Sequence, residues 1–376
     1  MDAIIGVKSE PPTGLETPRP RAAVQAISPY QAGMTPELAR RRYGREAFAK
    51  LSSNENPYGP SPRAVEAAAA VLGQLEFYPD SSSAALRQAL AAHVGRPVER
   101  IVTGPGSEAL IDYFFRAYLV PGEVLLLSRP TFPSYDIFAL SAGARIIDVP
   151  RTATFELDVG AIAAALREAP RALALCTPNN PTGNRTSRGD LEAILDATPL
   201  STLILFDEAY FEFQDEASAL DLLEDWGGVF LLARTFSKAY GLAGMRVGYA
   251  VASSPDVVGA LDALRPAFNI SSPSQAAAIA ALADQDHMRA GVAKIAAERD
   301  RVEAALSEAG VFHTPSLANF AFVRCRGSLE ATFDRLLRAG LIVRPIPIRG
   351  EAWLRITVGK PADNDALLAH LIEAIR

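Results

Sequence analysis

The sequence predicts an α/β protein with two domains: a large one with a mostly parallel central sheet flanked by helices, and a smaller α+β one. Its 376 residues are too many for one ordinary hydrophobic core. Short, almost wholly apolar runs, typical of strands buried on both faces, alternate with helical stretches rich in alanine and leucine. Such alternation indicates parallel strands joined through helices.

The large domain is predicted over residues 61–270, after a flexible leader and the first part of the small domain. The leader, residues 1–22, has four prolines and no hydrophobic periodicity. The basic run at 40–42 is expected on the solvated face of a short helix. Helices are expected over 61–74, 83–93 and 108–119, and strands over 100–102, 124–127, 173–176, 203–206, 229–233 and 247–252.

The small domain is predicted to combine both ends of the chain, residues 23–60 and 271–376. It begins its second part with a long helical region, residues 276–309. The expected order then is a strand over 321–324, a helix over 329–339, strands over 341–344 and 353–357, and a helix over 364–375.

Composition excludes several classes of function. The 37 basic and 43 acidic side chains leave a net charge of −6, and no basic stripe is present, so we expect no nucleic-acid partner. No apolar run reaches the roughly 18 residues of a membrane span, and the N-terminus lacks a signal-peptide pattern, which favours the cytoplasm. The two cysteines lie in apolar runs typical of a core, and the four histidines have no metal-ligand spacing.

Polar and glycine-rich segments follow the predicted strands. They occupy residues 103–107, 129–132, 177–183, 207–210 and 235–238. Because ligands of open parallel sheets bind beyond the carboxyl ends of the strands, we expect these segments to form one site.

Two cofactors were weighed for this site. Residues 104–109 fit the G-x-G-x-x-A pattern of dinucleotide binding, but Pro105 lies in the turn and Ser128-Arg129-Pro130 stands where an acidic residue is needed. Pyridoxal phosphate fits better. Its aldehyde needs a lysine such as Lys238, its ring nitrogen a carboxylate such as Asp207, and its phosphate a helix N-terminus with hydroxyls and an arginine.

Each of these residues has an ordinary reading when taken alone. Lys238 would be a solvated lysine, Asp207 a helix cap, residues 180–183 a turn, and Phe132 a core side chain. Their common position after successive strands favours the cofactor site.

These motifs resemble fold-type I pyridoxal-phosphate aminotransferases and, within them, the histidinol-phosphate aminotransferase family. The resemblance implies an aspartate-aminotransferase-like fold. It covers nearly everything after the leader, through residues 28–31, 51–60, 78–80, 179–183, 207–210, 234–246 and 354–359.

The resemblance also implies a role for each site residue. Lys238 would carry the cofactor as a Schiff base and move the proton at the donor's Cα. The cofactor would be held by Asp207 at the ring nitrogen, Tyr210 and Asn180 at the phenolate oxygen, Phe132 on the ring, Gly106, Ser107, Thr235, Ser237 and Arg246 at the phosphate, and Tyr78 from the second subunit of a homodimer. Substrate would be held by Tyr30, Asn56, Arg344 and Arg355.

The expected reaction is a ping-pong transamination between histidinol phosphate and 2-oxoglutarate, as in histidine biosynthesis. Two alternatives on the same scaffold stay open, an aromatic amino acid aminotransferase and a threonine-phosphate decarboxylase. A non-catalytic cofactor-binding domain of a transcription regulator is a third, although residues 1–60 offer no helix-turn-helix and no basic face.

Overall fold

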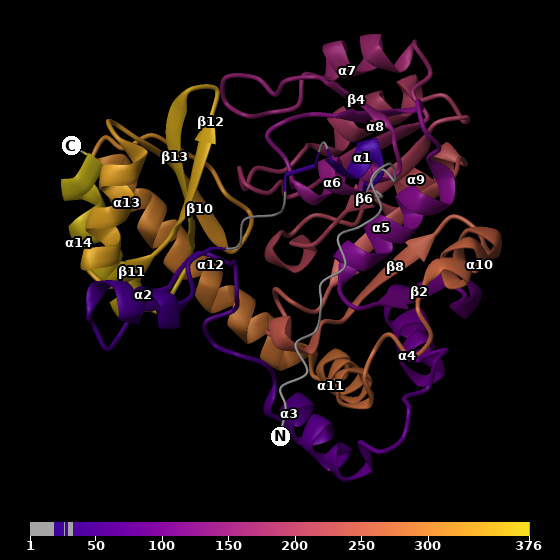
Figure 1. Cartoon of the computed structure of the whole chain (residues 1–376), viewed down its shortest axis with the longest axis horizontal. Helices are drawn as coiled ribbons and strands as arrows, with labels where there is room; N and C mark the ends of the chain where they lie inside the picture. Colours follow the sequence, from indigo (N-terminus) through magenta and orange to yellow (C-terminus); the bar gives the residue numbers. More distant parts are fainter. Residues whose placement is uncertain (1–18, 26, 29–32, 376) are drawn as a thin grey trace, which may run out of the picture.

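The protein is described by a computed structural model covering residues 19–25, 27–28 and 33–375. A large sheet with helices on both faces forms one part, and a smaller sheet with the C-terminal helices forms the other (Figure 1). The predicted α/β class is therefore confirmed. The predicted domain boundaries remain predictions.

The large sheet has seven strands in the order β2-β8-β7-β6-β5-β3-β4. Its strands are β2 (Ile101–Gly104), β3 (Val124–Leu127), β4 (Arg145–Asp148), β5 (Ala172–Cys176), β6 (Leu203–Asp207), β7 (Phe230–Thr235) and β8 (Gly248–Ala252). Every strand predicted from the sequence in this region is present. The edge strand β4 was missed because its residues are mostly exposed and it lacks a continuous apolar run.

One strand departs from the parallel pattern. β8 pairs antiparallel with both β7 and β2, whereas β7, β6, β5, β3 and β4 are mutually parallel. Between β7 and β8 the chain forms only the short helix η4 (Ala243–Met245). A parallel return needs a longer crossover, usually an α-helix, so this connection favours an antiparallel neighbour.

Helices cover the two faces of this sheet with separate cores. One face packs against α5 (Ser107–Tyr118), α6 (Ser134–Ser141) and α10 (Pro255–Leu264). The other packs against α3 (Pro62–Ala70), α4 (Ala84–Val94), α7 (Val159–Leu166), α8 (Arg188–Ala197), α9 (Leu220–Trp226) and α11 (Ser272–Leu282). Successive strand residues alternate between these cores, as a pleated strand buried on both faces requires.

Several helices begin at a serine that supplies the cap. Ser187, Ser254, Ser271 and Ser328 each accept a hydrogen bond from the backbone N–H three residues on. Such caps satisfy an otherwise unpaired donor and determine where the helix starts.

The second part is built on the sheet β12-β13-β10-β9. Its strands are β9 (His313–Thr314), β10 (Phe320–Cys325), β12 (Arg344–Ile348) and β13 (Glu351–Thr357), and its helices are α12 (Gln285–Glu308), α13 (Leu329–Arg338) and α14 (Pro361–Ile375). The long helical region predicted over 276–309 is divided, since α11 ends at Leu282 and α12 starts at Gln285.

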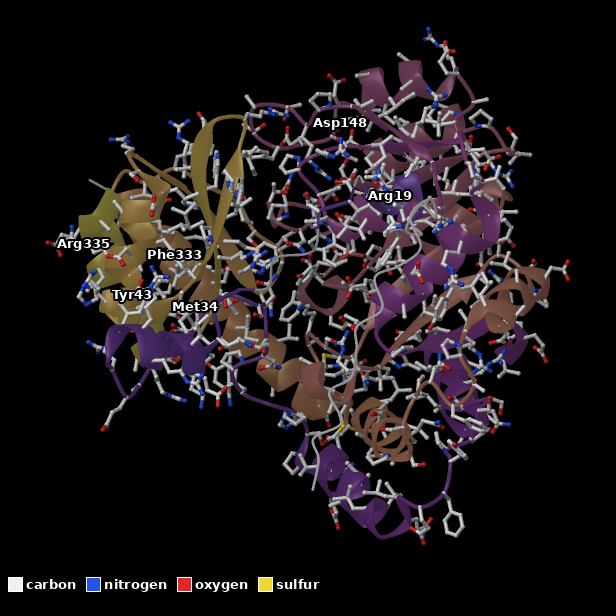
Figure 2. All side chains as sticks on the ribbon, in the orientation of Figure 1. Arg19, Met34, Tyr43, Asp148, Phe333 and Arg335 are labelled. Atoms are coloured by element: carbon white, nitrogen blue, oxygen red, sulfur yellow. The ribbon has the colours of Figure 1, made fainter. Side chains whose placement is uncertain are left out.

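The N-terminal segment packs onto this C-terminal part. β1 (Ala49–Lys50) pairs with β11 (Leu341–Ile342), and α2 (Pro36–Tyr43) lies against α13, where Figure 2 shows Met34, Tyr43 and Phe333. The three arginines of the basic run are exposed on α2, as expected. The short helix α1 (Ala22–Gln25) lies against α6.

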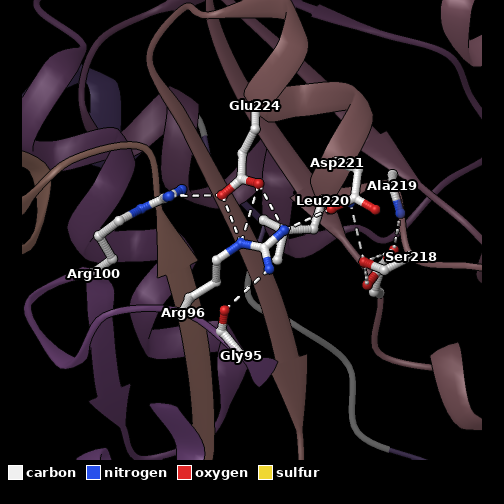
Figure 3. Close-up of polar contacts among 9 residues, drawn as sticks. Gly95, Arg96, Arg100, Ser218, Ala219, Leu220, Asp221 and Glu224 are labelled. Atoms are coloured by element: carbon white, nitrogen blue, oxygen red, sulfur yellow. Dashed lines mark hydrogen bonds and ion pairs between the residues drawn. The ribbon is translucent and has the colours of Figure 1, made fainter. Parts of the chain in front are cut away.

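A surface ion-pair network joins segments of the large part. Glu224 on α9 accepts hydrogen bonds from Arg96 and from Arg100 (Figure 3). Arg100 is the last residue of η2 (Val98–Arg100), and Arg96 lies in the turn just before this helix. The remaining short helices are η1 (Leu72–Gln74) and η3 (Phe211–Phe213).

Two further features bear on the sequence expectations. Cys176 and Cys325 are both free and buried, as predicted for core residues. In the part of the chain that the structure describes, no helix is both long and apolar enough to cross a membrane.

Candidate active site

A pocket lies where β5, β6 and β7 end and where the smaller sheet approaches the large one. Of the predicted site residues that the structure describes, all line it except Asn56 and Tyr78. The lining residues are Gly33, Ser52, Ser53, Asn54, Gly106, Ser107, Glu108, Phe132, Cys176, Asn180, Asp207, Ala209, Tyr210, Thr235, Ser237, Lys238, Arg246, Arg344 and Arg355.

Lys238 follows β7 and presents its amine to this pocket. Its Nζ donates a hydrogen bond to the backbone oxygen of Ser53 at 3.1 Å. Burial and, after it, the positive charge of Arg355 together lower the pKa of Lys238 to about 7. A substantial fraction of the amine is therefore neutral and nucleophilic near neutral pH.

Asp207, the last residue of β6, supplies a buried carboxylate. It is 3% exposed, and its two oxygens accept hydrogen bonds from the Tyr135 hydroxyl at 2.6 Å and from the backbone N–H of Ala209 at 3.0 Å. Burial raises the pKa of Asp207 to about 6, although both hydrogen bonds act to lower it. Such a group can hold a proton on a basic ring nitrogen.

One end of the pocket is built to receive an anion. Gly106 has φ 87° and directly precedes Ser107, the first residue of α5. A Cβ on Gly106 would lie 2.7 Å from Nη2 of Arg246, so only glycine lets the guanidinium approach the helix N-terminus this closely. Nη1 of Arg246 donates to Oγ of Ser237 at 3.2 Å. Together they offer backbone N–H groups, a hydroxyl and a cation.

The opposite end carries two further arginines. Arg344 on β12 and Arg355 on β13 are directly paired residues of the smaller sheet. Arg355 donates to Oδ1 of Asn180 and to the backbone oxygen of Ser52, each at 2.7 Å. Because the Asn180 side-chain oxygen accepts from Arg355, its amide nitrogen is oriented to donate to a cofactor oxygen. This end suits a second anionic group, on the substrate.

Tyr210 lies between these two ends and is 3% exposed. Burial raises its pKa to about 12, so the hydroxyl remains protonated and can donate. It also accepts a hydrogen bond from Nδ2 of Asn54 at 2.8 Å. Asn54 is in turn held by Thr357 and Asn319, and its φ of 55° is one that asparagine tolerates better than most residues.

Asn54 and Tyr135, which hydrogen-bond to Tyr210 and Asp207, are among the residues that the sequence prediction did not name. Asn54 lies inside the motif over 51–60, so its polar character in that segment was the available signal. Tyr135 lies three residues after Phe132 on α6 and reads as an ordinary core aromatic. Its contact with Asp207 joins residues 72 positions apart, which no local pattern reveals.

Two of the predicted residues that the structure describes are not in this pocket, and a third, Tyr30, lies outside the described residues. The Asn56 side chain donates to the backbone oxygen of Ala239 at 2.9 Å and accepts from the backbone of Tyr58. Tyr78 is 81% exposed and stacks on Phe268 with ring centroids 4.5 Å apart. The roles predicted for all three remain predictions.

The residues present fit pyridoxal phosphate. Lys238 and Asp207 would supply the amine and the carboxylate that the cofactor needs, and the glycine-lined helix terminus with Arg246 would supply the phosphate site. A Cβ on Gly248 would lie 2.2 Å from the backbone nitrogen of Ser107, so a second glycine keeps this terminus in place.

The fold and this pocket define a class I and II aminotransferase, and the family model described as aminotransferase class I and II matches residues 46–375. A curated relative, histidinol-phosphate aminotransferase 2 of Caulobacter vibrioides, is 54% identical, with 94% of each chain covered. Histidinol-phosphate aminotransferase 1 of Mesorhizobium japonicum is 40% identical, covering 94% of this chain and 98% of the relative. The chain belongs to the histidinol-phosphate aminotransferase family.

Solved structures agree with this assignment. The histidinol-phosphate aminotransferase of Sinorhizobium meliloti, in complex with pyridoxal-5′-phosphate, superposes with a TM-score of 0.87 at 33% identity, covering 96% of this chain and 98% of that one. An aspartate aminotransferase variant of Thermus thermophilus has a TM-score of 0.82 at 23% identity, and this likeness concerns the fold alone.

Proposed function

We propose that this protein binds pyridoxal phosphate and transfers the amino group of histidinol phosphate to 2-oxoglutarate. The observation that carries the proposal is the buried amine of Lys238 beside the Asp207 carboxylate, in a pocket with arginines at both ends. One cationic end serves the cofactor phosphate and the other an anionic substrate.

Pyridoxal phosphate supplies an electrophilic aldehyde and a ring that accepts electron density when a proton leaves the substrate. Lys238 would hold the aldehyde carbon, and Asp207 would keep a proton on the ring nitrogen. Tyr210 and Asn180 would donate to the phenolate oxygen, and Phe132 would lie against the ring. Gly106, Ser107, Thr235, Ser237 and Arg246 would hold the phosphate.

Lys238 has a second task once an amino donor has displaced it. Its neutral amine would remove the proton from the donor's Cα and would then donate a proton to the carbon that was the cofactor's aldehyde, which is general base and then general acid catalysis. The pKa of about 7 suits both directions, because the amine is then half protonated near neutral pH.

The choice of substrate depends on Arg344 and Arg355. Histidinol phosphate has no carboxylate, so these arginines would bind its phosphate in the first half-reaction and a carboxylate of 2-oxoglutarate in the second. The names of the relatives that are 54% and 40% identical support this donor. Tyr30 and Asn56 are proposed to assist.

The proposal includes a homodimer in which Tyr78 reaches the phosphate of the neighbouring site. Arg246 at that end is exposed in the single chain, and Phe77, Tyr78 and Phe268 are 68%, 81% and 43% exposed. Exposed aromatic side chains close together support a protein interface there. A cytoplasmic location is supported by the two free thiols, which are typical of reducing compartments.

A half-reaction screen tests the function. Purified holoenzyme is mixed separately with histidinol phosphate, phenylalanine and threonine phosphate, while the cofactor absorbance is followed. We expect histidinol phosphate to react fastest and later addition of 2-oxoglutarate to yield glutamate. Faster reaction with phenylalanine, or carbon dioxide release from threonine phosphate, would replace this function with one of the two alternatives.

A further inference from the structure

Tyr135 touches two groups of the site from behind without lining the pocket. It is fully buried on α6, and its hydroxyl donates to Oδ2 of Asp207 at 2.6 Å. Its ring meets that of Phe132 edge-on, with centroids 5.5 Å apart and an interplanar angle of 85°. One side chain thus contacts both the proposed ring platform and the proposed ring-nitrogen partner.

A carboxylate as buried as Asp207 depends on its hydrogen-bond donors. An ionised group removed from water is strongly destabilised unless such donors satisfy it. The backbone N–H of Ala209 serves one oxygen and Tyr135 the other. A hydroxyl bonded to an ionised oxygen at 2.6 Å is in the range of a charge-assisted bond, about twice as strong as a neutral one.

The protonation state of Tyr135 decides which group donates in its hydrogen bond with Asp207. Burial raises the pKa of Tyr135 well above its ordinary value, and the negative charge of Asp207 adds to the effect. Tyr135 therefore keeps its proton and acts as the donor.

A buried cation lies behind the phenol. Arg151 is 4% exposed, and its guanidinium donates to the backbone oxygens of Ser128 at 3.2 Å and Phe155 at 3.0 Å. Its positive charge acts on both Tyr135 and Cys176.

We propose that Tyr135 is a positioning residue for transamination: its hydroxyl keeps the Asp207 carboxylate ionised and fixed in orientation for the cofactor ring. This inference rests on the proposed function. Tyr135 touches neither cofactor nor substrate in this role, and it acts through Asp207.

Other groups around Asp207 also affect its charge and must stay constant in a test. Those that face it or its partners are Glu208 and Tyr210 after β6, Lys238 after β7, Cys176 on β5 and Arg151 after β4. A Tyr135→Phe substitution leaves all of these side chains in place and keeps the aromatic packing, and besides the bond to Asp207 it removes only the interaction of the hydroxyl with the Cys176 thiol. Tyr113→Phe, at a buried tyrosine of the same core on α5, is the matched control.

The first readout is the pH dependence of apoenzyme stability. The pKa of Asp207 is raised from 3.8 to about 6 on folding, so the stability that this group contributes is present below about pH 4 and lost as pH rises through about 6. Removing the Tyr135 hydroxyl raises that pKa further. Tyr135→Phe should therefore lower the apoenzyme melting temperature by a few degrees more at pH 8 than at pH 5. Tyr113→Phe should show no such difference.

The second readout separates positioning from packing. In Tyr135→Phe holoenzyme, kcat should fall about 10- to 100-fold, with KM for histidinol phosphate nearly unchanged, and the cofactor dissociation constant should rise. In an Asp207→Asn background, the extra cost of Tyr135→Phe at pH 8 should disappear, because no charge is left to stabilise.

An equal loss of stability at pH 5 and pH 8, with unchanged kcat, would overturn the inference and leave Tyr135 as a core residue. Failure of the proposed function would be recognised by a different result. Wild-type protein would then form no glutamate from histidinol phosphate and 2-oxoglutarate, while the apoenzyme comparison would still decide the role of Tyr135.

Discussion

Replacing Glu208 with glutamine tests the buried ion pair that lies beside the active site. Its Oε2 accepts from Nη2 and Nε of Arg234 at 2.7 and 2.9 Å, and the two side chains are only 1% and 8% exposed. The other oxygen accepts from the backbone N–H of Ala219, and both accept from Ser218. A glutamine amide at this position would direct its NH2 group toward a donor in either orientation, toward Arg234 in one and toward the Ala219 N–H in the other. The buried guanidinium would also lose its counter-ion.

Breaking one side of such a pair costs about 3–5 kcal/mol, a large part of the ~5–15 kcal/mol that stabilises a typical native protein. We expect Glu208→Gln to lower the free energy of unfolding by that amount, measured by urea denaturation at fixed protein concentration. The matched control is Glu192→Gln, which breaks the exposed pair with Arg188 at 3.2 Å, where the side chains are 52% and 49% exposed. It should cost about 0.3–0.5 kcal/mol. A loss no greater than in the control would refute the reasoning.

Four other predictions concern the pocket. Lys238→Ala should abolish glutamate formation and borohydride labelling at that position, and activity at the wild-type level would contradict the assignment. Because the pKa of Lys238 is lowered to about 7, cofactor uptake by the apoenzyme should accelerate between about pH 6 and pH 8, whereas a flat stopped-flow profile would argue against a titrating amine. Arg355→Gln should move this midpoint to higher pH, since a cation is removed, and raise KM for histidinol phosphate about 10- to 100-fold in steady-state assays. Gly248→Ala should weaken cofactor binding in equilibrium titrations, because its Cβ would meet the Ser107 nitrogen at 2.2 Å. Gly259→Ala on α10, with no atom within 4 Å of the added carbon, should bind the cofactor normally.

Much of the site could be predicted because its residues come in short segments at the ends of buried strands. Lys238 and Asp207 each follow a predicted strand, and parallel strands bring their carboxyl ends together. The glycine at position 106 was predictable for a similar local reason, since it precedes a helix that the apolar spacing predicts. The edge strand β4 was missed because its residues are mostly exposed, and the antiparallel direction of β8 depends on a short chain reversal that the sequence pattern did not specify.

By itself, the sequence determined the α/β class, the strands of the large sheet other than β4, and the type of chemistry at their ends. These follow from apolar periodicity and from motifs a few residues long, which are local properties of the chain. The tertiary structure alone decided which polar groups meet. Tyr135 donates to Asp207, Asn54 to Tyr210, and Arg355 to Asn180 across 72, 156 and 175 positions of sequence. Such contacts depend on how the two sheets and their helices pack, because only this packing brings the two partners of each bond within hydrogen-bond distance.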